Sequence, residues 1–340
     1  MENRKDVLLD IRNLEVEYKT EDGVVEAVNK IDLTVRKGET VGLVGETGAG
    51  KTTVALSILR LIPDPPGEIV QGEIFWKDKD LLKESVSEMQ KIRGDHISMI
   101  FQDPMTALNP VHTIGEQIAE SIILHQKLGK KEAEKAAKKT LELVGIPGER
   151  YGDYPHQFSG GMKQRVVIAI ALACNPELLI ADEPTTALDV TIQAQILEMM
   201  NRLKEDMNMS MIMITHDLGI VAEMCDRVAV MYAGQIVEWG TTRQIFKNTL
   251  HPYTIGLFGS LPDMSDADTL DFANRRLKPI SGMMPDPTRL TKWCHFAERC
   301  PYKTEECEKA AIPLRDSGDG HLVRCCHTDL GKEAVNAVKS

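Results

Sequence analysis

The sequence predicts an α/β fold with a largely parallel sheet, because short apolar runs alternate along the chain with helical patterns. The run Thr40–Val44 lies between polar segments, and a glycine-rich turn and a helical pattern from Thr52 to Leu61 follow it. Later runs of similar length are typical of buried strands: Leu178–Ala181, Met209–Ile214 and Val228–Tyr232. The last run continues through a glycine into Ile236–Trp239, which indicates a hairpin.

Composition divides the chain into a large region and a smaller C-terminal one. Residues 1–250 carry the strand and helix patterns, beginning with the alternating apolar residues of Leu14–Tyr18. The helix-rich stretch from about 103 to 176 lies between two groups of strands, which predicts an inserted helical subdomain. In residues 251–340 the periodicity fades and Pro, Asp, Arg and Cys become frequent, so we expect a small appended domain there.

Charge and hydropathy limit the possible functions. The 340 residues are 42% hydrophobic and 27% charged, and the net charge of −11 argues against a nucleic-acid partner. Met1–Asp10 lacks the apolar core of a secretory signal. The longest apolar run, Val166–Cys174, is far shorter than the ~20 residues of a spanning helix. We therefore expect any membrane role to be peripheral, and the 7 cysteines to lie in a reducing compartment.

Residues Gly45–Thr52 read GETGAGKT, a full match to the phosphate-binding pattern G-x-x-x-x-G-K-[ST]. By chance this pattern arises in on the order of one in a hundred chains of this length. Backbone N–H groups of the glycines can surround phosphate oxygens, Lys51 can reach the outer phosphates, and Thr52 can ligate Mg²⁺. The residues expected to bind a nucleoside triphosphate are Gly45, Glu46, Thr47, Gly48, Ala49, Gly50, Lys51, Thr52 and Thr53.

A second strand supplies acidic groups. Residues 178–183 read LLIADE, so Asp182 and Glu183 emerge at the carboxyl end of a buried strand, where α/β sheets bind ligands. We expect Asp182 to hold Mg²⁺ through water and Glu183 to polarise an attacking water. An acidic pair in this position is often only a helix cap, but the phosphate-binding pattern upstream favours the metal and water roles.

Residues Phe158–Arg165, FSGGMKQR, resemble the signature motif of the ABC ATPases. Ser159 has the position of a helix N-cap, and the amides of Gly160 and Gly161 can approach an anion. The alternative is a glycine-containing helix start without a ligand. In the family this helix start, which here includes Met162, contacts the γ-phosphate bound by the opposite subunit; many members have glutamine at the Met162 position.

Further residues match the ABC ATPase pattern in its order along the chain. Tyr18 resembles the aromatic residue that stacks on adenine, although a core strand tyrosine is the alternative. Gln102 resembles the glutamine that senses Mg²⁺ and the attacking water, and Asp189 lies in a loop resembling the one that crosses the dimer interface. His216, in ITHD, resembles the histidine that contacts the γ-phosphate. The resemblance, over about residues 7–250, implies a RecA-like parallel sheet with an antiparallel β subdomain. It also implies ATP hydrolysis by Glu183, His216 and Gln102, with Mg²⁺ held by Thr52, Gln102 and Asp182.

The segment His251–Thr254, HPYT, resembles an element that follows the ATPase core in oligopeptide and dipeptide import subunits. Residues Tyr154–Met162 and Gln102–Pro110 also resemble that branch. The resemblance implies an ATPase at the cytoplasmic face of the cell membrane that powers peptide import. Its implied partners are a second ABC ATPase subunit, identical or distinct, two integral membrane permeases and, indirectly, an extracellular solute-binding protein.

Other functions remain open at this point. Related subunits import nickel or other small solutes. A soluble ABC ATPase of repair or translation often carries two cassettes or a long inserted coiled coil, and neither pattern is present here. A metal- or redox-responsive binding module is a third possibility, because five of the seven cysteines lie between Cys294 and Cys326.

The C-terminal cysteines favour a metal over disulfides in a reducing compartment. The spacing C-x5-C-x6-C-x17-C matches neither a common zinc pattern nor a common ferredoxin pattern, so it does not choose the metal. Resemblance to peptide-import subunits suggests a [4Fe–4S] cluster that staples the segment, with Cys325 preferred over Cys326 because His321–Cys325 resembles a terminal family pattern. Zn²⁺ with His295, His321 or His327, a disulfide knot, and small buried apolar residues are the alternatives. The expected cluster ligands are Cys294, Cys300, Cys307 and Cys325.

Overall fold

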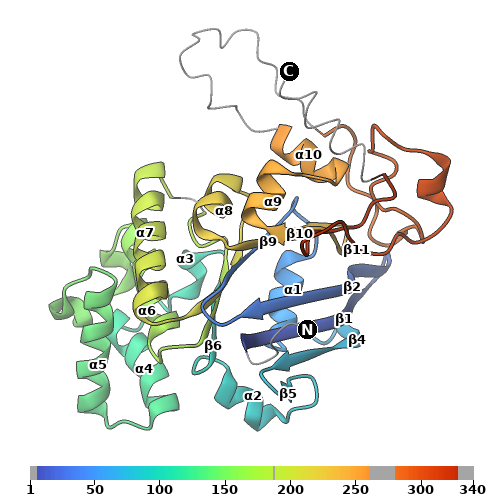
Figure 1. Ribbon diagram of the computed structural model, residues 1–340. Helices are drawn as coiled ribbons and strands as arrows, with labels where there is room; N and C mark the ends of the chain where they lie inside the picture. Colours follow the sequence, from blue (N-terminus) through green and yellow to red (C-terminus); the bar gives the residue numbers. More distant parts are fainter. Residues whose placement is uncertain (1–5, 187, 260–279, 328–340) are drawn as a thin grey trace, which may run out of the picture.

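The computed structural model describes residues 6–186, 188–259 and 280–327, and two sheets organise them (Figure 1). The main sheet has the strand order β11-β12-β10-β9-β3-β8-β7-β6. Its pairs β3–β8, β3–β9, β7–β8 and β6–β7 are parallel, whereas β9–β10, β10–β12 and β11–β12 are antiparallel. The strands are β3 (Thr40–Val44), β6 (Ile97–Ile100), β7 (Leu178–Asp182), β8 (Ser210–Ile214), β9 (Arg227–Tyr232), β10 (Gln235–Thr241), β11 (Arg315–Asp316) and β12 (Leu322–Val323).

The second sheet is antiparallel and packs against one face of the first. Its order is β2-β1-β4-β5. Leu14 and Val16 of β1 are buried in one apolar cluster with Val41 of β3 and Ile58 of helix α1 (Lys51–Ile58), so α1 lies in the core shared by the two sheets. The strands are β1 (Val7–Thr20), β2 (Gly23–Arg36), β4 (Gly67–Trp76) and β5 (Lys79–Asp80).

Helices form the other major core. Apolar residues of α4, α5, α6 and α7 pack in one cluster with Leu179, Met211 and Met213 of the main sheet. Figure 1 shows these helices gathered at one end of the molecule, with the C-terminal residues 280–327, in red, at the other. None of the helices in the described ranges is both long and apolar enough to cross a bilayer. The helices are α2 (Val86–Ile92), α3 (Pro104–Ala107), α4 (Ile114–Gln126), α5 (Lys130–Leu143), α6 (Gly160–Leu172), α7 (Val190–Asp206), α8 (Leu218–Met224), α9 (Thr242–Lys247), α10 (Pro252–Gly259), and the 3₁₀ turns η2 (Gly148–Gly152), η3 (Pro155–Gln157) and η5 (Glu305–Glu308).

The α/β fold and its buried strands are confirmed, with small differences at the ends of elements. The run Thr40–Val44 is β3, and all five of its residues are buried. The helix expected to reach Leu61 ends at Ile58, because the backbone turns at Leu59 and Arg60 takes a positive φ of 50°. The domain limits, including the helical subdomain at 103–176, stay predictions.

The described part of the C-terminal region is joined to the main sheet rather than separate from it. Strand β12 pairs with β10, with Val323 opposite Glu238. The Glu238 carboxylate is fully buried, and it accepts hydrogen bonds from the backbone N–H groups of Leu250 (2.8 Å) and His251 (3.0 Å). Nε2 of His321, the residue before β12, lies 2.8 Å from the same carboxylate. Residues 260–279 and 328–340 of the expected C-terminal domain lie outside the described ranges.

The substitution Glu238→Gln is expected to destabilise the fold by about 3 kcal/mol, because an amide cannot accept from all three donors and the buried pair with His321 is broken. Denaturant unfolding monitored by circular dichroism measures the loss. Glu223→Gln, an exposed change on α8, is the control. An unfolding free energy for Glu238→Gln equal to that of the control would show that this carboxylate does not hold the C-terminal strand.

Candidate functional site

At two positions, the loop between β3 and α1 adopts a backbone conformation that only glycine accommodates. Gly45 has a φ of 153°, and a Cβ there would lie 2.2 Å from the carbonyl oxygen of Met231. Gly50, the residue before α1, has a φ of 99°, and a Cβ would lie 2.3 Å from the carbonyl oxygen of Ala27. The loop is therefore closely packed against β2 and β9, and its backbone amides lead into the N-terminus of α1, which favours an anion.

Two side chains at the start of α1 make contacts, one with the loop and one with the neighbouring strand β7. Nζ of Lys51 donates hydrogen bonds to the carbonyl oxygens of Gly45 (2.8 Å) and Glu46 (3.0 Å). Burial lowers the pKa of Lys51, while the nearby carboxylates oppose that change. Thr52 Oγ1 donates to Asp182 Oδ2 at 2.8 Å. The hydroxyl of the loop and the carboxylate of β7 are thus adjacent, as the sequence pattern predicts.

The oxygen atoms of Thr52 and Asp182 fit a magnesium ion. Both are hard oxygen donors, the type of ligand that Mg²⁺ prefers in phosphate sites. Asp182 ends β7, and burial raises the pKa of its carboxyl group. A bound cation at this position would oppose that rise, because it would stabilise the ionised carboxylate.

Three polar side chains surround the Glu183 carboxylate. Gln102 Nε2 donates to Oε2 at 2.9 Å, Thr186 Oγ1 donates to Oε2 at 2.9 Å, and His216 Nδ1 lies 3.1 Å from Oε1. Burial by itself would raise the pKa of Glu183, but these hydrogen bonds outweigh burial and lower this pKa from its usual value. The side chains of Gln102, Glu183 and His216, all expected to be catalytic, therefore meet in space.

One cleft of about 430 Å³ contains most of the residues expected to bind nucleotide. Its lining includes Thr47, Gly48, Gly50, Lys51, Thr52, Thr53, Tyr18, Gln102, Asp182 and Glu183. Met284, Pro285, Pro287 and Leu290 also line it. No sequence pattern pointed to these C-terminal residues.

The signature residues lie away from this cleft. Ser159 caps α6, its Oγ accepting from the Met162 N–H at 3.4 Å, and Ser159 and Gly160 are exposed. A Cβ on Gly161 would lie 2.6 Å from Ile192, so that glycine allows α6 to approach α7. None of these signature residues is among the described residues that line the cleft.

Asp189, expected to lie in a loop at the dimer interface, is not among the described residues that line the cleft. Asp189 is the N-cap of α7, and its Oδ1 accepts from the Ile192 N–H at 3.0 Å. The side chain of Asp189 is exposed. Ala187, in the same loop, lies outside the described residues.

Two contacts to Glu46 were not foreseen from the sequence. The Tyr253 hydroxyl accepts a hydrogen bond from the Glu46 N–H at 2.9 Å. The Arg299 guanidinium donates to both carboxylate oxygens of Glu46, at 2.7 and 3.1 Å. Tyr253 belongs to the HPYT segment, which was recognised only as a family feature, and no motif marks Arg299.

The chain is similar in sequence to ATP-binding transport subunits over nearly its whole length. Residues 28–186 match the family described as ABC transporter, and residues 237–307 match the oligopeptide/dipeptide transporter C-terminal region. The dipeptide transport ATP-binding protein DppD of Bacillus subtilis is 49% identical over 335 residues, 98% of each chain. The chain belongs to the ABC transporter family of ATP-binding proteins. The oligopeptide transport ATP-binding protein OppD of the same organism is 49% identical over 338 residues, 98% of this chain and 93% of that one.

Solved structures agree with this assignment to the ABC ATPases. The dimeric post-hydrolysis structure of the cassette MJ0796, bound to ADP and Pi, superposes with a TM-score of 0.62 at 27% identity. The match covers 69% of this chain and 99% of that one. The expected ABC ATPase fold is therefore confirmed, and this family hydrolyses ATP.

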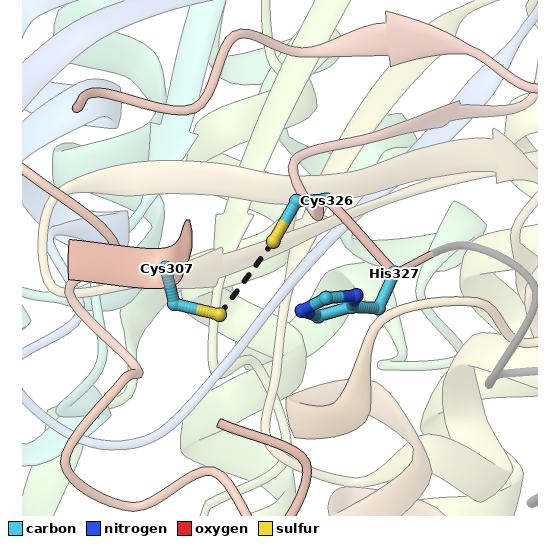
Figure 2. A group of neighbouring side chains, drawn as sticks. All are labelled: Cys307, Cys326 and His327. Carbon is cyan, nitrogen blue, oxygen red and sulfur yellow. Dashed lines mark hydrogen bonds between the residues drawn. The ribbon is translucent and has the colours of Figure 1, made fainter. Parts of the chain in front are cut away.

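The prediction of a [4Fe–4S] cluster, with zinc as its alternative, is wrong for this ABC ATPase. Its relatives are described as peptide transport ATP-binding proteins, which supports ATP and Mg²⁺ as its cofactors. Among the described residues, the one group with metal-compatible atoms within 4.8 Å of one another is Cys307, Cys326 and His327 (Figure 2). It contains one of the four expected ligands.

The C-terminal cysteines gather around one cavity, and burial favours the neutral form of at least two of them. All five C-terminal cysteines line one small cavity, but burial raises the pKa of Cys294 to about 11 and that of Cys300 to about 12. With these raised pKa values, the unliganded thiols are neutral at pH 7. Cys325 packs with Leu250 and Val323 in an apolar cluster. These contacts agree with the alternative of small buried apolar side chains.

The substitution Gly50→Ala is expected to weaken ATP binding at least about tenfold, because its Cβ would collide with the Ala27 carbonyl at a strained positive φ. Equilibrium titration with ATP and Mg²⁺ measures the change. Gly152→Ala is the matched control, since a Cβ at that glycine meets nothing within 4 Å. Unchanged affinity for Gly50→Ala, with an intact fold, would contradict the close packing of the loop.

Proposed function

We propose that this chain hydrolyses ATP in the cleft between the phosphate-binding loop and Glu183, and that hydrolysis drives import of dipeptides or oligopeptides. One observation carries the proposal: residues of the loop, Asp182, Glu183 and its hydrogen-bond partner Gln102 all line a single cleft. A loop without an adjacent acid would support binding alone. The adjacent carboxylates supply what hydrolysis also requires.

Different residues would bind the phosphates and the adenine base of ATP. Backbone amides from Gly45 to Thr53 and the N-terminus of α1 would hold the phosphates, with Lys51 neutralising their charge. Tyr18 lines the same cleft near the end of β1, which supports stacking on adenine. Thr52 and Asp182 would hold Mg²⁺, which neutralises charge on the outer phosphate oxygens.

The environment of Glu183 supports its role toward water. Its lowered pKa keeps the carboxylate ionised and able to accept a hydrogen bond from an attacking water. The hydrogen bond from Gln102 orients the carboxylate. His216 Nδ1 contacts the same carboxylate, and the side chain of His216 is 69% exposed, which leaves the ring accessible to a terminal phosphate.

A second subunit would complete each site. Ser159 and Gly160 form an exposed helix start away from the cleft of their own chain, which is the arrangement expected if they contact ATP held by a partner. The similar cassette MJ0796 was solved as a dimer. Asp189, exposed before α7, would lie at the same interface.

The transport role rests on the relatives and on the C-terminal region. The relatives DppD and OppD are described as dipeptide and oligopeptide transport proteins. The partners are a second ABC ATPase subunit, two integral membrane permeases and, indirectly, an extracellular solute-binding protein. We place the chain peripherally at the cytoplasmic face of the membrane, where ATP is available to it. Co-purification with two integral membrane proteins, and ATP-dependent peptide uptake into vesicles that contain them, test this role.

The substitution Glu183→Gln is expected to keep ATP binding and to lower turnover at least about a hundredfold, because an amide cannot polarise the water as a carboxylate does. Phosphate release and ATP affinity are measured on the same preparation. Glu198→Gln, an exposed change on α7, should behave as wild type. Turnover close to wild type in the Glu183 variant would remove this residue from the reaction.

The substitution Ser159→Arg is expected to block hydrolysis while the chain's own loop still binds ATP, because the added side chain would collide with the partner's nucleotide. ATP affinity is measured on dilute monomer and turnover on the assembled pair. Ser87→Arg on α2 is the control for an added exposed arginine. Loss of ATP affinity in the monomer, with the fold intact, would place Ser159 at its own site instead.

A further inference from the structure

Residues from the stretch 280–299 of the C-terminal region line the phosphate-binding cleft. Met284 and Leu290 are half-buried, and both line the same cleft as Lys51. The Pro287 carbonyl accepts a hydrogen bond from the Glu26 N–H at 3.0 Å, which attaches this stretch to β2. The wall that these residues form is apolar, and the phosphate-binding groups lie on the loop.

Arg299 attaches the same segment to the loop itself. Its guanidinium donates to both oxygens of the Glu46 carboxylate, and its side chain is only 7% exposed. It also donates to the carbonyl of Ser281 at 3.0 Å and to the Tyr232 hydroxyl at 3.3 Å. The hydrogen bonds to Glu46 raise the pKa of Arg299. Such a two-point ion pair fixes orientation as well as distance.

Glu46 connects Arg299 to the loop amides and to Lys51, the groups that would bind phosphate. Its N–H is held by the Tyr253 hydroxyl, and its carbonyl accepts from Lys51 Nζ at 3.0 Å and from the Ala49 N–H at 3.1 Å. The C-terminal region therefore holds the side chain and the amide of Glu46, while the carbonyl of Glu46 holds Lys51. A shift of Glu46 would move the loop amides and the lysine together.

We propose that residues 280–299 are part of the nucleotide site of their own chain: Arg299 positions the phosphate-binding loop through Glu46, and Met284 and Leu290 contact the nucleoside part of the nucleotide. The inference rests on the proposed function, because it places ATP in this cleft. The inference implies that ATP binding and the packing of residues 280–299 against the loop favour each other. Bound ATP would stabilise this packing, and the packing would raise the affinity for ATP.

The test uses the full chain and two probes, ATP and inorganic tripolyphosphate, each with Mg²⁺. Arg299→Gln is expected to weaken binding of both probes about tenfold, because the loop is affected, and to raise KM more than it lowers kcat. Arg299→Lys, which keeps the charge, should recover part of the affinity. Arg315→Gln, an exposed arginine on β11, is the control.

The apolar wall has its own readout. Leu290→Ser is expected to weaken ATP binding severalfold and to leave tripolyphosphate binding unchanged, because the probe without a nucleoside does not reach the wall. Leu124→Ser, at a residue of α4 that is 71% exposed, is the matched control. Equal losses for the two probes would overturn the assignment of Leu290 to the nucleoside.

A double-mutant cycle tests whether Arg299 acts through Glu46. The Glu46→Gln/Arg299→Gln pair should bind no more weakly than the weaker single variant, and additive losses would overturn the inference. If Arg299→Gln does not fold, Glu46→Gln tests the same contact from the loop. If both single variants bind ATP with wild-type affinity, this inference is overturned while the proposed ATP site is not. Wild-type affinity in Lys51→Ala would instead overturn the proposed ATP site, and this inference with it.

Discussion

The parallel pairing of β8 with β3 on one side and β7 on the other is the constraint on which the site depends. It aligns the carboxyl ends of three buried strands, so the loop after β3, the acidic pair at the end of β7 and His216 after β8 meet at one edge. The Thr52–Asp182 hydrogen bond is a consequence of that alignment. Helices on one face and the antiparallel sheet on the other keep the strands buried, which makes their register specific.

Two acid–base contacts join the C-terminal region to the ATPase core. In each, a core carboxylate meets a basic side chain of residues 280–327: Glu238 with His321, and Glu46 with Arg299. Because burial of such polar groups costs desolvation, these contacts contribute little net stability, but they select one arrangement of the parts they join. The first contact aligns a strand with the main sheet. The second connects the same region to the phosphate-binding loop. The C-terminal region therefore contacts both the main sheet and the nucleotide site.

The cysteines illustrate the limit of reading a ligand set from spacing. Grouping of the thiols is visible in the sequence, and the structure does gather them around one cavity. Which sulfur atoms approach each other depends on the path of the chain between η5 and β12, and it brings Cys307 to Cys326 at 3.5 Å. Burial also raises the pKa of Cys294 and of Cys300, since desolvation favours the neutral thiol.

The sequence by itself determined the α/β class, the phosphate-binding loop, the acidic pair and the ABC family, because each depends on residues that are close in the chain and have a fixed local geometry. Element ends were less certain, as the early end of α1 before Arg60 shows. Only the tertiary structure decided that Gln102, Thr186 and His216 surround Glu183, and that Arg299 reaches Glu46. Apart from Thr186, these partners are far apart in sequence from the residues that they contact, and side-chain packing, which no local pattern encodes, sets the distances.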